Sequence, residues 1–179
     1  SYSFEHRGYH FAMTRLVEEA IGPKQLNWLR DDLAPHAGKS FVFGHVPLQS
    51  VIARTHFAFR TELGRLFTGA GVLAYLCGHE HVFWDEELSV DEKKLRQVIV
   101  GTASGTYNFP LHRQALQQNC QGTQCAMPFG GKKFEIKAGT FEQVRTQFFV
   151  IVEVHGEHFE VKPWSFDSSS GELVPFYVD

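Results

Sequence analysis

Two short stretches of alternating hydrophobic and polar residues open the chain and predict a β-hairpin. The runs cover residues 2–5 and 9–13, with Arg7-Gly8 between them. Alternation with a period of two is typical of a strand with one buried face, and an intervening glycine favours a turn. The chain is therefore expected to begin with two antiparallel strands.

Helical and strand-like patterns alternate in the residues that follow. A leucine repeat after Pro23 predicts a first helix, and its members are Leu26, Leu29 and Leu33. A second amphipathic helix is predicted over residues 59–70. Continuous apolar runs at residues 40–44 and 71–77 predict two buried strands. Because a helix connects these strands, we expect them to be parallel and close together in one sheet.

The second half of the chain changes to strand-like patterns. Strands are predicted at residues 82–88, 96–101, 132–137, 146–154, 158–163 and 173–178, and an irregular insert at about residues 106–131. No linker divides the chain. The pattern as a whole predicts an α/β fold with a strand-rich C-terminal tail, in one domain that covers residues 1–179.

Composition narrows the classes of function. The chain has 179 residues, of which 43% are hydrophobic, so it is long enough for one sizeable core and too apolar for disorder. Its net charge of −3 gives no global basic field for nucleic acid or an anionic membrane. No run approaches the ~20 apolar residues of a membrane span. The chain has ten histidines but only two methionines, and a histidine content this high suggests a search for metal ligands.

Three of these histidines follow the two predicted buried strands. They occur in Gly44-His45 and in Gly78-His79-Glu80-His81. Parallel strands end at the same edge of a sheet, where ligands of open α/β folds bind, so the three imidazoles should converge. Imidazole nitrogens bind borderline metals such as zinc, manganese and iron. His79 and His81 point to different sides of a loop, which suits two neighbouring ions.

This ordered pair of motifs resembles the last two signature motifs of the calcineurin-like metallophosphoesterases, the superfamily that includes the purple acid phosphatases. The resemblance covers about residues 1–108, including Gln25-Leu-Asn-Trp-Leu before Gly-His and Val98-Ile-Val-Gly101 after Gly-His-x-His. It implies the C-terminal part of a β-sandwich flanked by helices. It further implies hydrolysis of a phosphoric ester at two metal ions (Mn, Fe or Zn), with His45 and His79 on one ion and His81 on the other.

His56 also has a counterpart in the purple acid phosphatases. There, a histidine a short way past the Gly-His motif contacts the phosphate and can protonate the leaving group. The resemblance implies the same role for His56. The alternative is an ordinary histidine on a surface loop.

The sequence departs from the family at its start, because the Asp-x-His, Gly-Asp-x2-Asp and Gly-Asn-His motifs are absent. The chain thus looks like the C-terminal half of such a domain. We expect the bridging aspartate to come from a missing N-terminal half, the isolated chain to be inactive, and its open surfaces to bind that half or another copy. The alternative is a non-catalytic metal-binding or scaffold module of the same fold.

Other candidate residues lead to simpler expectations. Cys77 lies in an apolar run and should be a buried thiol, whereas Cys120 and Cys125 form either a disulfide or two free thiols. The charged residues 85–87 predict a solvated face. His155-Gly-Glu-His158 lies between two alternating runs and predicts a hairpin turn with exposed histidines rather than a metal site.

Overall fold

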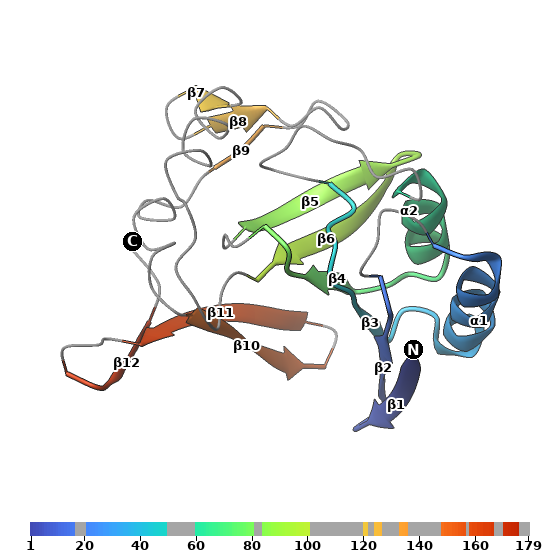
Figure 1. Cartoon of the computed structure of the whole chain (residues 1–179), viewed down its shortest axis with the longest axis horizontal. Coiled ribbons are helices and arrows are strands. Elements are labelled where there is room, and N and C mark those ends of the chain that lie inside the picture. Colours follow the sequence, from blue (N-terminus) through green and yellow to red (C-terminus); the bar gives the residue numbers. More distant parts are fainter. Residues whose placement is uncertain are drawn as a thin grey trace.

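The computed structural model describes residues 1–16, 21–49, 60–80, 84–100, 120–121, 124–126, 133–135, 148–156, 158–166 and 170–175. Figure 1 shows a large twisted sheet, two helices on one side of it, and a smaller sheet on the other. This arrangement confirms the α/β class. Within the described residues, no helix is long and apolar enough to cross a membrane.

The large sheet has six strands in the order β1-β2-β3-β4-β6-β5. They are β1 (Tyr2–His6), β2 (Tyr9–Met13), β3 (Ser40–Phe43), β4 (Ala74–Cys77), β5 (Trp84–Val90) and β6 (Lys93–Ile99). The inner strands β2, β3, β4 and β6 run parallel, and the edge strands β1 and β5 are antiparallel to their neighbours. The predicted hairpin and the predicted parallel pair β3–β4 are therefore confirmed.

Two helices cover one face of this sheet. Helix α1 (Pro23–Leu33) begins at a proline, and it buries the predicted leucine repeat. Proline is favourable at this position because the backbone N–H groups of a first helical turn have no hydrogen-bond partner within the helix. A single 3₁₀ turn, η1 (Ala34–His36), leads from α1 to β3. Helix α2 (Arg60–Gly69) joins β3 to β4 and buries Leu63 and Phe67. Both helices thus lie where the hydrophobic periodicity predicted them.

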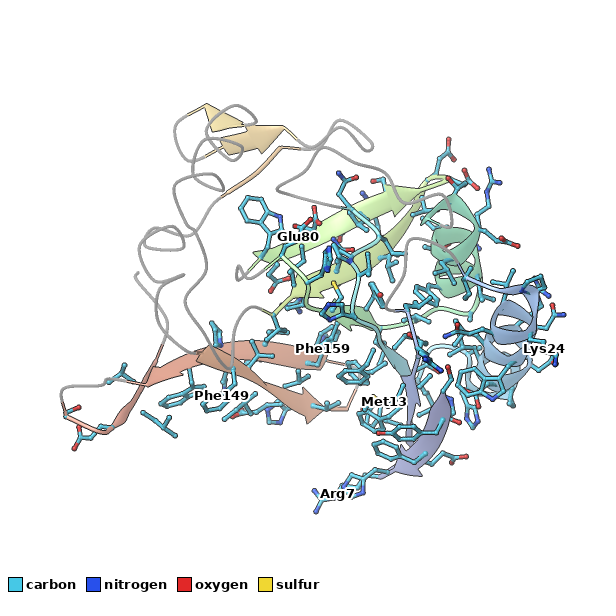
Figure 2. The ribbon with its side chains drawn as sticks, in the orientation of Figure 1. Arg7, Met13, Lys24, Glu80, Phe149 and Phe159 are labelled. Atoms are coloured by element: carbon cyan, nitrogen blue, oxygen red, sulfur yellow. The ribbon has the colours of Figure 1, made fainter. Side chains whose placement is uncertain are left out.

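Alternation along β3 and β4 divides the core into two layers. Val42 and Tyr75 face the helices, whereas Phe41 and Leu76 face the opposite side. That side is covered by a second antiparallel sheet, made of β10 (Phe148–His155), β11 (His158–Phe166) and β12 (Leu173–Pro175). Phe159 of β11 packs edge-on against Phe41, with ring centroids 5.2 Å apart (Figure 2).

Some strand boundaries differ from the predicted ones. The hairpin of β5 and β6 turns at Asp91-Glu92, and both residues have positive φ, which matches the twist of a tight hairpin. The two strands therefore meet closer to this turn than the sequence suggested. The insert expected to be irregular contains β7 (Cys120–Gln121) and β8 (Gln124–Ala126), which pair with each other, and β8 also pairs with β9 (Lys133–Glu135).

Candidate metal centre

His45 and His79 come together at the carboxyl ends of β3 and β4. The register pairs Phe43 with Leu76 at the ends of the two strands, so the following turns lie side by side. His45 Nε2 is 3.4 Å from His79 Nδ1, and the two rings are nearly perpendicular. Both side chains are exposed to solvent. The predicted convergence therefore holds for these two histidines, whereas His81 and His56 lie outside the described residues.

The spacing of the two nitrogens suits one shared metal ion. Ligands bound to zinc at 2.0–2.1 Å in a tetrahedron lie about 3.3 Å from each other. The observed separation of 3.4 Å between His45 Nε2 and His79 Nδ1 is close to that value. Among the described residues, no third histidine, cysteine or carboxylate joins this pair at ligand distance. Two imidazoles leave other coordination positions to be filled from elsewhere.

The absence of a side chain at Gly44 leaves room for Tyr75, which hydrogen-bonds to the turn after β3. A Cβ atom at Gly44 would lie 2.3 Å from Tyr75 Oη. The hydroxyl of Tyr75 donates a hydrogen bond of 2.6 Å to the carbonyl of Val46. Burial raises the pKa of Tyr75 well above its usual range, so the hydroxyl keeps its proton and remains a donor. The phenol therefore fixes the backbone beside His45.

Backbone contacts connect the two histidine turns directly. The amide of Gly78 donates to the carbonyl of His45 at 2.9 Å, and the amide of Gly44 donates to the carbonyl of Leu76 at 3.0 Å. His79 itself has a φ of 70°, a left-handed conformation that is costly for a residue other than glycine. The surrounding hydrogen bonds hold His79 in this unfavourable conformation, in which its ring approaches His45.

Gln97 on β6 holds the segment that follows His45. Its Oε1 accepts hydrogen bonds from the amides of Leu48 and Gln49, at 2.7 and 3.1 Å. Its Nε2 donates to the carbonyl of Gln49 and to Glu86 Oε1. Sequence reasoning missed both Tyr75 and Gln97. A signal was available for Tyr75 alone, as a polar hydroxyl in an otherwise apolar strand, which needs a buried partner.

The expected solvated face of residues 85–87 is wrong for Glu86, which is 4% exposed. Side chains alternate along β5, so Glu86 points inward with Trp84 and Leu88 while its neighbours point outward. The amide of Gln97 offsets the loss of water around the buried carboxylate. On the outer side, Asp85 forms a two-point ion pair with Arg96.

Cys77 is a buried free thiol, as predicted. Burial, followed by the nearby carboxylates of Glu80 and Glu86, raises the pKa of this thiol well above its usual range. A thiol that keeps its proton at neutral pH is a poor metal ligand and a poor nucleophile. The arrangement assigns Cys77 to the core rather than to the centre beside it.

The remaining sequence expectations have mixed outcomes. His155 and His158 pair directly across a tight hairpin, and His155 is 66% exposed, which confirms the predicted turn with exposed histidines. Cys120 lies opposite Cys125 in the β7–β8 ladder, where neighbouring Cα atoms have the spacing of disulfide-bonded residues. The backbone register is compatible with both alternatives for these two cysteines.

Comparison with known proteins identifies a shared fold and no family. No protein-family model matches the chain, and no curated protein matches it. Among solved structures, the chain is similar to one described as GAP50, the anchor in the inner membrane complex of Plasmodium. The two share 15% identity with a TM-score of 0.55, over 99% of this chain and 53% of the other. The chain thus spans about half the length of that protein, and the likeness concerns the fold alone.

Proposed function

We propose that this chain supplies the histidine ligands of a two-metal phosphoesterase centre, and that the whole protein hydrolyses a phosphoric ester. The observation that carries the proposal is the 3.4 Å separation of His45 Nε2 and His79 Nδ1 at adjoining strand ends. The order Gly44-His45 and then Gly78-His79-x-His81, which resembles the metallophosphoesterases, supports it.

In this proposal each histidine has a distinct task. His45 and His79 hold one ion, His81 binds the other, and His56 contacts the phosphate and protonates the leaving group. The ions, which would be Mn, Fe or Zn, supply Lewis-acid activation of water and stabilise negative charge. Two divalent ions also need anionic ligands. Among the described residues no carboxylate joins His45 and His79 at ligand distance, and the family resemblance gives the bridging aspartate to a motif that this sequence does not contain.

The proposal is tested with p-nitrophenyl phosphate and added Mn²⁺, Fe²⁺ or Zn²⁺. The full-length protein should be active, and His79→Ala or His81→Ala should each lower activity by orders of magnitude. His155→Ala, which removes an exposed histidine from a hairpin turn, is the matched control and should retain activity. The isolated 179-residue chain should turn over little or no substrate. Robust turnover by that chain, surviving His79→Ala, would contradict the proposal.

A scaffold function is the second candidate, and the similarity to an anchor protein favours it. The two functions differ in metal content. Two ions per full-length chain that are lost in the variant His45→Ala/His79→Ala/His81→Ala would support the phosphoesterase, one such ion a metal-binding module, and none a scaffold. Metal analysis of the purified full-length protein therefore separates the candidates without knowledge of the substrate.

A further inference from the structure

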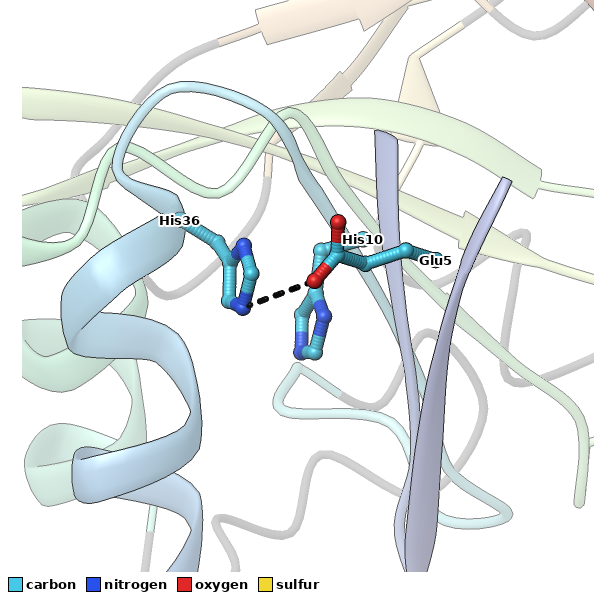
Figure 3. A group of neighbouring side chains, drawn as sticks. All are labelled: Glu5, His10 and His36. Carbon is cyan, nitrogen blue, oxygen red and sulfur yellow. Dashed lines mark ion pairs between the residues drawn. The ribbon is translucent and has the colours of Figure 1, made fainter. Parts of the chain in front are cut away.

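A second group of metal-binding side chains lies at the other end of β3 (Figure 3). Glu5 of β1, His10 of β2 and His36 of η1 each offer one ligand atom, and these atoms lie within 4.8 Å of one another. His10 pairs with Ser40 at the start of β3, whereas His45 follows the end of that strand. The group is therefore separated from His45 and His79 by the length of the strand.

A carboxylate holds one of the two ring nitrogens of His10. Its Nε2 lies 2.7 Å from Asp32 Oδ2, and the other oxygen of Asp32 accepts a hydrogen bond from Ser3. A carboxylate acceptor favours the proton on Nε2 and leaves a lone pair on Nδ1. A carboxylate that orients a metal-binding imidazole through its second nitrogen is a recurrent feature of zinc sites.

The second nitrogen of His10 is the observation that points to a ligand. His10 is 3% exposed, and its Nδ1 has no hydrogen-bond partner among the residues that the structure describes. A buried polar nitrogen without a partner is costly to a fold. A metal ion bound to that lone pair would remove the cost. His36 stacks on the His10 ring at a centroid distance of 3.9 Å, and Glu5 Oε1 lies 3.7 Å from His36 Nε2.

We propose that Glu5, His10 and His36 bind one borderline transition ion, with Zn²⁺ as the best fit. Two imidazoles and one carboxylate, with water in the fourth position, form an established ligand set for this ion. Tetrahedral ligand atoms lie about 3.3 Å apart, so binding must draw the group together by at most about 1.5 Å. It must also turn the His36 ring out of its parallel stack on His10, because the lone pair of an imidazole nitrogen lies in the plane of its ring. Glu5 is 66% and His36 24% exposed, and these two side chains can move toward the fixed His10.

The bound ion would connect three elements that the chain brings together only through folding. It would tie the edge strand β1 and its partner β2 to η1, the turn that leads from α1 into β3. A ligand that binds the folded state alone stabilises that state by mass action. The site is therefore inferred to be structural, and it stands independently of the proposed phosphoesterase centre.

The test uses the 179-residue chain carrying His45→Ala and His79→Ala, so that the other candidate centre cannot bind. Zn²⁺ is titrated by calorimetry, and Co²⁺ is titrated by its visible ligand-field absorption. We expect one ion per chain, bands of a tetrahedral complex, and a higher melting temperature with Zn²⁺. In ¹H–¹⁵N spectra of the imidazoles, Zn²⁺ should shift Nδ1 of His10 while Nε2 keeps its proton.

Variants of the more exposed ligands avoid disruption of the core. His36→Ala and Glu5→Gln should each weaken Zn²⁺ binding by at least about tenfold, and Asp32→Asn by the 10–100-fold typical of an orienting partner. His155→Ala is the matched control and should leave the affinity unchanged. Circular dichroism confirms that each variant is folded. Absence of Zn²⁺ binding, or binding that survives both His36→Ala and Glu5→Gln, would overturn the proposal.

Discussion

Gly44 lies directly against the phenol of Tyr75. The hydroxyl oxygen would be 2.3 Å from a Cβ atom at residue 44, and that same hydroxyl donates to the carbonyl of Val46. A glycine immediately before His45 is therefore required by packing. The fold and the candidate metal centre depend on the same contact.

Gly44→Ala should displace the ring of Tyr75 and lower the free energy of unfolding by about 1–3 kcal/mol, the range for forced overpacking. It should also weaken metal binding by His45, because the adjoining backbone moves. Chemical denaturation and metal titration measure the two effects. Gly69→Ala is the control, since a Cβ there meets no atom within 4 Å. Equal stability of the two variants would contradict this account of Gly44.

Gln97→Met should be strongly destabilising although it nearly preserves side-chain volume. It leaves Glu86 and the backbone of Leu48 and Gln49 without the amide that now pairs with them. Each of these hydrogen bonds contributes about 0.5–1.5 kcal/mol, and the one to the charged carboxylate of Glu86 about 1.5–3 kcal/mol. Urea unfolding should show this loss. In the control Glu87→Gln, an exposed ion pair with Lys94 is lost, which is worth at most about 1 kcal/mol.

Cys77 should react slowly with thiol reagents in the folded chain. Its pKa is raised, so the reactive thiolate is depleted about tenfold for each unit of the rise, and burial blocks access as well. Raising the pH from 7 to 9 should speed the reaction of both the folded and the unfolded chain, and the folded chain should remain the slower at each pH because a smaller fraction of its thiol is ionised. The measurement uses Cys120→Ser/Cys125→Ser, which leaves one thiol. Rapid labelling of the folded variant at pH 7 would refute the assignment of Cys77 to the core.

The edge strand β1 should promote self-association. It exposes Tyr2 by 63% and Phe4 by 45% beside unpaired backbone groups of the sheet edge. Light scattering of the isolated chain should therefore show an average mass that rises with concentration. Tyr2→Lys should reduce this rise, because a charged residue disfavours edge-to-edge pairing. A 20.4 kDa monomer at every concentration would rule the prediction out.

The approach of His45 to His79 could be predicted because local patterns determine it. Two apolar runs joined by an amphipathic helix give parallel strands, and a glycine followed by histidine ends each run. The supporting contacts could not be predicted in the same way. Tyr75 and Gln97 act through register and side-chain direction across three strands, and these emerge only when the sheet has formed.

The group of Glu5, His10 and His36 had no signal in the sequence. Its members come from three elements and follow no ligand spacing, because packing of the 3₁₀ turn η1 against the first hairpin brings them together. The burial of Glu86 was hidden for a related reason. A run of three acidic residues resembles a solvated face until the alternation of β5 assigns its middle member to the interior.

The central claim is that His45 and His79 share a metal ion, and anomalous X-ray scattering tests it most directly. Crystals of the chain are soaked in Zn²⁺ or Mn²⁺, and data are collected on both sides of the absorption edge. The account predicts an anomalous peak between His45 Nε2 and His79 Nδ1, within about 2.0–2.1 Å of both nitrogens for zinc. A saturating soak that leaves this position without a peak, with the two nitrogens still 3.4 Å apart, would contradict it.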